Sequence, residues 1–230
     1  MTGERVLGVD ACKAGWVGIA LAGDDVRAYA AAQIAELVST ADEDGRLSVV
    51  AIDMPVGLAD AGRRLADELA RKDIGTLWAS VFITPVRTAI EAADLAAANV
   101  VNREWAKEGV SAQAFGLRHK LLQVDRWVRR QTRRVVEVHP EVSFAQLAGG
   151  PLTERKHTWA GAARRRRLLA DAGVTMADDL GEAGGRAGVD DVLDAAVAAW
   201  TARRVARGEA RCIPDRPQVF SDGLECAIWV

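Results

Sequence analysis

Four aspartates stand out because of where they occur in the sequence. Asp10 and Asp53 each come directly after a short apolar run of strand length. A carboxylate in that position is costly unless solvent, an opposite charge or a metal ion stabilises it. Asp191 and Asp194 lie three residues apart in a helical pattern, so their side chains project from the same helix face. A cluster of such oxygens suits Mg²⁺ or Mn²⁺ better than zinc.

Each of these aspartates also has a structural interpretation. Asp10 and Asp53 can cap turns, and Met-Pro follows Asp53. Asp191 can complement the positive end of a helix dipole, and the neighbouring Asp190 is a natural N-cap. Asp194 falls close to the apolar side of its helix, where a structural role is harder to find. We interpret the combination as a divalent-metal site, because ligands of open α/β sheets lie at the carboxyl ends of the strands.

A second group of ionisable residues surrounds the predicted strand at 134–138. Glu137 alternates with two valines and faces away from them, so it is either a metal ligand or a residue on a solvated face. His139 is a candidate general acid or base, and otherwise a structural histidine. Arg87 can bind a phosphate or carboxylate through its planar guanidinium, and otherwise lies on the surface. Arg118 can add compensating positive charge beside such a substrate.

The elements that must position these residues begin with short apolar runs. Three runs in close succession predict an antiparallel meander, with Gly-Asp-Asp as a turn between the second and third. The fourth is apolar apart from Ser48, as expected for a strand that is buried on both faces. The predicted strands occupy residues 5–9, 16–21, 26–32, 47–52, 134–138 and, after a short tail, 226–230.

Helical periodicity fills most of the remaining sequence. The region at about 58–132 is mainly helical in pattern and predicts an insertion between two strands. Four consecutive arginines at 164–167 cover one helical turn, so we expect them to point in all directions and to be solvated. Glycines at 184–188 predict a linker. The clearest predicted helices span residues 34–40, 62–72, 114–130, 152–173 and 190–208.

Length and composition limit the class of protein. The chain has 230 residues, 50% of them hydrophobic, and a formal net charge of −2. This is enough for a substantial core and is as compatible with one domain with an insertion as with two domains; we predict a single α/β domain over residues 1–230, because strands and helices alternate along it. The near-neutral charge excludes a global polycation that coats nucleic acid. Three scattered cysteines form neither a disulfide framework nor a zinc motif. Without an apolar run of about 18 residues or a signal peptide's apolar core, we expect a cytoplasmic protein with no membrane partner.

Five segments together resemble the DUF429 family, which is described as a family of predicted nucleases with an RNase H-like fold. The segments span nearly the whole chain and follow the order of the family's motifs. They are Gly-Val-Asp-Ala-Cys-Lys-Ala-Gly-Trp at 8–16, Ala-Ile-Asp-Met-Pro-Val-Gly-Leu at 51–58, Ser-Val-Phe-Ile-Thr-Pro-Val-Arg at 80–87, Glu-Val-His-Pro-Glu-Val-Ser-Phe at 137–144 and Asp-Asp-Val-Leu-Asp-Ala at 190–195.

This resemblance implies an RNase H-like α/β fold, with a mixed five-stranded sheet flanked by helices and a mainly helical insertion at about 58–132. In the RNase H-like superfamily, an aspartate of the first strand, an acid of the fourth strand and an aspartate of a late helix ligate metal. These roles fall on Asp10, Asp53 and one of Asp191 and Asp194.

The leading functional hypothesis is a metal-dependent nuclease or phosphodiesterase that acts on DNA or RNA. Two metal ions would activate a water and stabilise the leaving oxygen, while Glu137 or His139 positions the water. One alternative is a nucleotide-binding or phosphotransfer protein of the actin and sugar-kinase branch, although the sequence has no second glycine-rich phosphate loop. Another is a non-enzymatic binding protein whose carboxylates are structural. The sequence leaves the substrate and the oligomeric state open.

Overall fold

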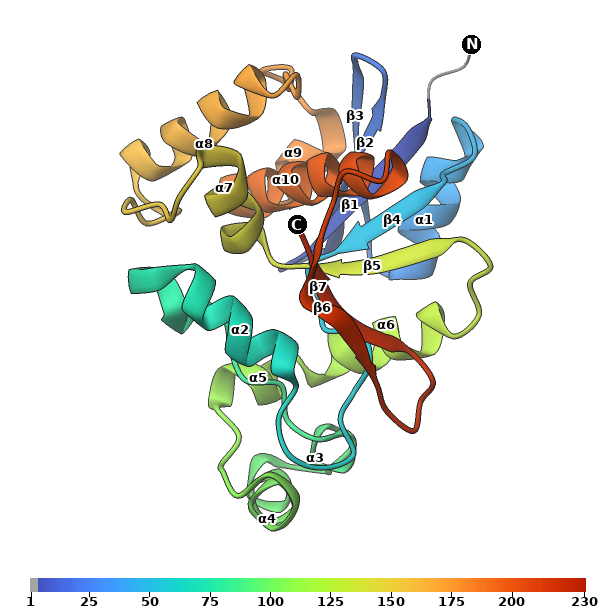
Figure 1. Cartoon of the computed structure of the whole chain (residues 1–230). Helices are drawn as coiled ribbons and strands as arrows, with labels where there is room; N and C mark the ends of the chain where they lie inside the picture. Colours follow the sequence, from blue (N-terminus) through green and yellow to red (C-terminus); the bar gives the residue numbers. More distant parts are fainter. Residues whose placement is uncertain (1–3) are drawn as a thin grey trace.

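The apolar runs of the sequence pair into one mixed, seven-stranded sheet in a computed structural model, which describes residues 4–230 (Figure 1). The strands are β1 (Arg5–Cys12), β2 (Gly15–Ala22), β3 (Asp25–Ala31), β4 (Val49–Ile52), β5 (Arg134–Val138), β6 (Cys212–Val219) and β7 (Glu225–Trp229). Their order in the sheet is β3-β2-β1-β4-β5-β7-β6. The β1–β2–β3 meander is antiparallel, as predicted, whereas β4, β5 and β7 run parallel to β1.

The sheet has seven strands where the family resemblance implied five, because an antiparallel hairpin of β6 and β7 extends it beyond β5. The segment that forms β7 was predicted as a strand near the C-terminus. Most of the segment that forms β6 was predicted as part of a tail at 214–230, and Pro214 and Pro217 lie within it. Proline cannot donate a hydrogen bond to a neighbouring strand, so it is confined to edge strands and irregular pairing. β6 is such an edge strand, and its register with β7 shifts between Ile213 and Gln218.

Helices cover both faces of the sheet. Two apolar cores join helices to the sheet: α7 (Pro140–Ala148), α8 (Trp159–Asp171) and α10 (Val189–Ala206) belong to the core on one face, and α1 (Ile34–Glu43) and α6 (Arg118–Val128) to the core on the other. Val6 and Val49 face the α10 side, whereas Leu7 and Val50 face the α1 side. Successive side chains of a strand point to opposite faces, so both faces of β1 and β4 are buried.

Gly8 allows α10 to lie against the backbone of β1. A Cβ atom built on Gly8 would lie 2.0 Å from the nitrogen of Ala199 and 2.2 Å from the carbonyl oxygen of Ala195. No side chain fits at such a distance, and the α10 residues that face β1 are correspondingly small. This close approach places the second turn of α10 beside the carboxyl end of β1.

The segment between β4 and β5 is mainly helical, in the region predicted as an insertion at about 58–132. It contains α2 (Leu65–Asp73), the 3₁₀ helix η1 (Gly75–Ser80), α3 (Arg87–Ile90), α4 (Leu95–Ala106), α5 (Ala112–Gly116) and α6. Part of it forms an apolar cluster of its own, which includes Val86, Ala98 and Val110. In Figure 1, α3 and α4 lie farther from the sheet than α6 does.

Two helices were not predicted. α7 follows β5 directly, with His139 as N-cap and Pro140 as its first residue, where the sequence predicted a turn. Proline is favoured at this first position because its missing N–H would be unpaired there in any case. α9 (Gly181–Arg186) occupies part of the predicted glycine linker. The N-cap of α10 is Gly188, so Asp190 is not the cap that its sequence position predicted.

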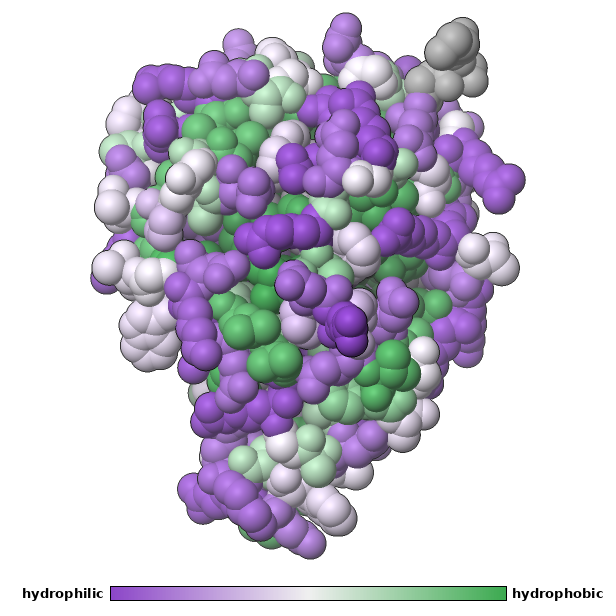
Figure 2. All heavy atoms as spheres, viewed as in Figure 1, coloured by the Kyte–Doolittle hydropathy of each residue, from purple (hydrophilic) through white to green (hydrophobic). Residues whose placement is uncertain are grey.

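The surface mixes polar and apolar residues. Figure 2 shows hydrophilic residues spread over the visible face, with apolar residues in small groups between them. Singly exposed apolar residues are normal for a folded domain. None of the helices within residues 4–230 has the length and hydropathy required to cross a bilayer.

Candidate metal centre

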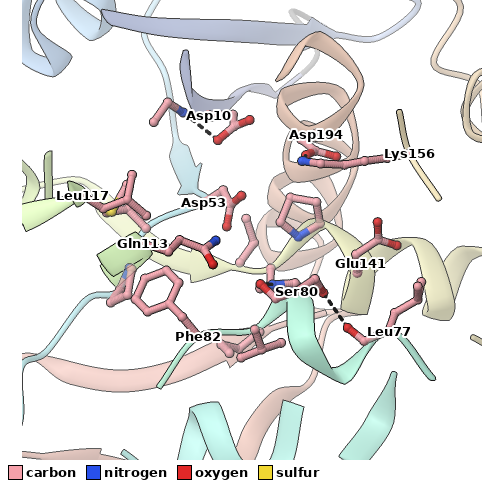
Figure 3. Close-up of a pocket in the computed structure, with 18 of the residues that line it drawn as sticks. Asp10, Asp53, Leu77, Ser80, Phe82, Gln113, Leu117, Glu141, Lys156 and Asp194 are labelled. Atoms are coloured by element: carbon pink, nitrogen blue, oxygen red, sulfur yellow. Dashed lines mark hydrogen bonds and ion pairs between the residues drawn. The ribbon is translucent and has the colours of Figure 1, made fainter. Parts of the chain in front are cut away.

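Three of the four predicted ligands converge at one edge of the sheet. Asp10, Asp53 and Asp194 each offer a carboxylate oxygen, and these oxygens lie within 4.8 Å of one another. The parallel register pairs Val9 with Ile52, so the next residues, Asp10 in β1 and Asp53 after β4, emerge side by side. The backbone N–H of Asp53 donates to the carbonyl oxygen of Val9 at 2.9 Å, which extends that pairing. Asp194 reaches the same point from the second turn of α10 (Figure 3).

Asp191 lines the same cavity but lies outside this cluster. Its Oδ2 accepts a hydrogen bond from the backbone N–H of Gly188 at 3.0 Å, at the N-terminus of α10. A carboxylate there satisfies an otherwise free N–H and complements the helix dipole. Of the two aspartates on α10, the structure therefore places Asp194 in the cluster and gives Asp191 the capping role.

Burial makes the three carboxylates hard to ionise together. Burial raises the pKa of Asp53 to about 8, and repulsion by Asp194 adds to that effect. The pKa of Asp10 lies well above its usual value for the same reason, with Asp53 the largest neighbouring charge. Burial also raises the pKa of Asp194 to about 6, although Lys156 lowers it. Ionising all three groups therefore costs free energy unless positive charge is added.

Lys156 supplies part of that positive charge. It was not identified from the sequence as a residue of the site. Its Nζ lies 2.5 Å from Oδ2 of Asp194 and 3.6 Å from Oδ2 of Asp190. The sequence predicted a helix over 152–173, whereas α8 begins only at Trp159, so the lysine lies in the preceding loop.

The donor atoms fit a metal ion. Oδ1 of Asp194 is buried and has no hydrogen-bond partner in the part of the chain that the structure describes. Buried polar atoms without a partner are rare, and each one requires an explanation. A carboxylate oxygen of this kind, beside those of Asp10 and Asp53, is a suitable ligand for a hard cation. The cluster can therefore hold a metal ion.

Glu137 lines the cavity but is engaged by other groups. Its Oε2 accepts hydrogen bonds from Nη2 of Arg64 and from the backbone N–H of Val56, the latter at 2.8 Å. Arg64 is fully buried and also pairs with Asp67 at 3.1 Å. Burial raises the pKa of Glu137 to about 7, against the lowering effect of Arg64. Glu137 is therefore buried, and it is not part of the carboxylate cluster. Arg64, which lies just before α2, forms an ion pair with it instead.

His139 also lines the cavity, at the start of α7. Its Nε2 lies 3.4 Å from the carbonyl oxygen of Ser80, and its buried Nδ1 has no partner among the residues described. Burial lowers the pKa of His139 to about 4, so the ring is neutral at pH 7. A neutral ring can accept a proton, but it adds no positive charge to the cavity. Its catalytic role stays a prediction.

The two predicted substrate-binding arginines do not line the cavity. Nη1 and Nη2 of Arg87 donate to Asp125 at 3.0 and 2.9 Å, and Nη2 also donates to Asp222 at 2.8 Å. Arg118 donates to the carbonyl oxygen of Phe115 at 3.3 Å, and its guanidinium carbon lies 4.1 Å from the centre of that ring. Arg87 therefore joins the insertion to the segment between β6 and β7, whereas Arg118 makes only local contacts, and neither lines the cavity.

The run of four arginines is not uniformly solvated, contrary to expectation. Arg165 is fully buried, and its Nη2 donates to both oxygens of Glu141 at 2.7 Å. Its Nη1 donates to the carbonyl oxygen of Glu154 at 2.9 Å. Arg166 is exposed and pairs with Asp178 at 2.5 Å. Arg165 thus connects α7 with α8 and with the loop that carries Lys156.

The carboxylates open onto a cavity of about 620 Å³ (Figure 3). Three consecutive basic residues, Arg155, Lys156 and His157, line it on the side of α10. Phe82 and Leu117 lie on the other side of Asp53 in Figure 3 and give the cavity an apolar part. This volume falls within the range typical of small-ligand sites. The cavity therefore combines carboxylates, a basic rim and an apolar wall.

Without metal, the protein is expected to lose stability as the pH rises from about 6.5 to about 8. The pKa of Asp53 is about 8 in the folded protein against an ordinary value of 3.8, so in this window the folded state binds the proton more tightly than the unfolded chain. Stability then falls by at most about 1.4 kcal/mol per pH unit for one proton. The pKa of His139 is lowered by folding, so this residue makes stability rise with pH, but only below about pH 6.5.

Thermal melts in EDTA at pH 6.5 and 8 measure this effect. The difference should shrink in Asp53→Asn, which cannot bind the proton, and excess Mn²⁺ should remove it in the unmodified protein. A melting temperature that rises between these two pH values would contradict the assignment of a raised pKa to Asp53.

The comparisons with known proteins identify the family. A family model described as "Protein of unknown function (DUF429)" matches residues 8–219. This range covers most of the chain and includes all three residues of the carboxylate cluster. Comparison with curated proteins and with solved structures finds no significant match. The extent of the family match shows that the chain belongs to the DUF429 family.

Proposed function

We propose that this protein is a metal-dependent nuclease or phosphodiesterase that acts on nucleic acid. The observation that carries the proposal is the convergence of Asp10, Asp53 and Asp194 at the floor of a cavity with a basic rim. Carboxylates that converge in this way are typical of enzymes that cleave phosphodiesters with divalent metal. A positive rim beside them is suited to a phosphate group.

The strand arrangement supports an RNase H-like assignment of the fold. The first five strands have the order β3-β2-β1-β4-β5, with an antiparallel meander followed by two strands parallel to β1. Asp10 lies in β1, Asp53 follows β4 and Asp194 lies on a late helix. These are the positions that the resemblance to the RNase H-like superfamily implies for the metal ligands. The β6–β7 hairpin would then be an addition to that core.

The three carboxylates would hold Mg²⁺ or Mn²⁺, because both ions prefer carboxylate oxygens as ligands. Such an ion, when bound, polarises a phosphate oxygen and lowers the pKa of water. The chain's own residues orient the substrate: the basic rim attracts the phosphate, and the neutral His139 can accept a hydrogen bond or a proton.

The cavity favours an unpaired nucleotide over an intact duplex. Its volume suits one nucleotide-sized group, and Phe82 and Leu117 can contact the apolar face of a base. Enzymes that read single strands commonly stack unpaired bases on aromatic side chains. We therefore propose a single-stranded end or loop as the substrate.

A panel of single-stranded, duplex, hybrid and branched DNA and RNA with Mg²⁺ or Mn²⁺ tests this function. We expect cleavage of single-stranded substrates, its loss in EDTA and weaker binding as salt rises, because basic side chains that neutralise phosphates release counterions. ATP hydrolysis is measured in parallel. ATP turnover without nucleic-acid cleavage would favour the phosphotransfer alternative, and metal binding without either activity would favour a non-enzymatic binding protein.

A further inference from the structure

Lys156 reaches the carboxylate cluster from a loop that is fixed in place. Its Nζ lies 2.5 Å from Oδ2 of Asp194, and 30% of its side chain is exposed. Oγ1 of Thr158, the N-cap of α8, donates to the carbonyl oxygen of Arg155 at 2.8 Å. The buried Arg165 donates to a second carbonyl of the loop at 2.9 Å. The lysine is therefore held in the site by its own loop and differs from a mobile surface side chain.

The contact with Lys156 gives the two oxygens of Asp194 different surroundings. Oδ2 accepts a hydrogen bond from the ammonium group of Lys156, whereas the buried Oδ1 has no hydrogen-bond partner within the described residues. Oδ1 is thus the oxygen that remains for a metal ion. Figure 3 shows the Lys156 side chain extending to Asp194 from the side opposite Asp10 and Asp53.

The charges of the cluster match one divalent ion. When Asp10, Asp53 and Asp194 are ionised, three carboxylates and one ammonium group leave a net charge of −2. One divalent ion neutralises that charge. A second ion would bring the charge of these groups to +2, of which Asp190, 3.6 Å from Nζ of Lys156, offsets one unit. Uncompensated buried charge costs several kcal/mol.

We propose that Lys156 takes the place of the second metal ion, so that the cluster binds a single divalent ion. In two-metal phosphodiesterases, two ions about 4 Å apart share the stabilisation of the attacking and leaving oxygens. Here the ammonium group supplies a fixed positive charge and hydrogen-bond donors at the edge of the cavity, next to the place for the phosphate. The inference rests on the proposed metal site and replaces the expectation of two ions. It does not depend on which substrate is cleaved.

Titration of the purified protein with Mn²⁺, followed by electron paramagnetic resonance and calorimetry, tests this inference. The unmodified protein should bind one Mn²⁺. Lys156→Met should bind the first Mn²⁺ about tenfold or more tightly, because repulsion by the ammonium group is lost, and should gain a second, spin-coupled Mn²⁺. Lys156→Arg retains the charge and should bind one ion. Lys13→Met removes an exposed lysine from the turn after β1 and should leave the titration unchanged.

Each other outcome has a definite consequence. Two Mn²⁺ ions in the unmodified protein, or a single ion of any affinity in Lys156→Met, would overturn the proposal and leave Lys156 as a group that only orients Asp194. No Mn²⁺ binding in a folded protein would overturn both this proposal and the metal site. One bound Mn²⁺ that becomes two in Lys156→Met, in a protein without nuclease activity, would uphold the role of Lys156 and reject the proposed activity.

Discussion

Asp10→Asn is expected to lower the rate of Mg²⁺- or Mn²⁺-dependent cleavage on the order of a thousandfold while leaving the fold intact. The substitution removes one charged ligand, and losing a single preorganised electrostatic contact in an active site commonly costs two to three orders of magnitude. The asparagine keeps an oxygen at this position, where Oδ1 of Asp10 accepts a hydrogen bond from the N–H of Ala11 at 2.6 Å. The loss of activity should therefore not reflect unfolding.

The same variant should melt at a higher temperature than the unmodified protein in EDTA, because one of three mutually repelling carboxylates is gone. Single-turnover cleavage of the best substrate in the panel and thermal melts with and without Mn²⁺ measure the two effects. Asp191→Asn is the matched control, since it lies in the same cavity and an asparagine can still cap α10. Equal losses of activity in both variants would place Asp191 among the ligands, and a lower melting temperature for Asp10→Asn under all conditions would indicate a structural role.

Arg165→Met is expected to lower the free energy of unfolding by about 3–5 kcal/mol, the range found when one partner of a buried ion pair is removed. The arginine is fully buried and donates to both oxygens of Glu141, so methionine leaves a buried carboxylate without its partner. Urea unfolding followed by circular dichroism measures the change. The variant should also bind Mn²⁺ more tightly at temperatures where it is folded, because the loop that holds Lys156 against Asp194 loses a hydrogen bond.

Arg166→Met is the control for this experiment, because it removes the neighbouring arginine of the same helix. Its partner Asp178 is 96% exposed, and exposed pairs contribute about 1 kcal/mol or less. Replacing both buried partners, as in Arg165→Met with Glu141→Leu, should recover much of the lost stability, since an apolar pair of similar volume is often neutral. Similar small effects of Arg165→Met and Arg166→Met would show that the buried pair contributes little.

The sequence predicted the features that depend on local pattern. Asp10 and Asp53 follow apolar runs, and parallel pairing brings the ends of such strands together. The periodicity of its helix placed Asp194 near the apolar face, which distinguished it from acidic residues on the solvent-exposed face. The first five strands and the late helix were predicted for the same reason, since alternation and helical spacing are visible within ten to twenty residues.

The missed features depend on partners that are distant in the sequence. Lys156 lies 38 residues from Asp194, and Arg64 lies 73 residues from Glu137. Nothing in the immediate neighbourhood of either basic residue shows which carboxylate it will meet. Arg165 was expected to be solvated because it lies in a run of four arginines. In the structure it lies on the buried side of that helical turn, where it meets Glu141. Which carboxylate a basic residue pairs with depends on tertiary contacts, and these leave no local pattern in a single sequence.

The absence of a side chain at Gly8 has a consequence for how this protein can change during evolution. The spacing between β1 and α10 is set by the contact of one main chain with another, so it depends on Gly8 and on the alanines of α10 that face it rather than on the larger core side chains. Apolar residues elsewhere around α10 can then be exchanged with little change in the distance between Asp10 and Asp194. Related proteins can therefore differ widely in their core residues while Asp10 and Asp194 stay close together. A Gly8→Ala substitution, in contrast, would push α10 away from β1 and separate the two ligands without contacting either one.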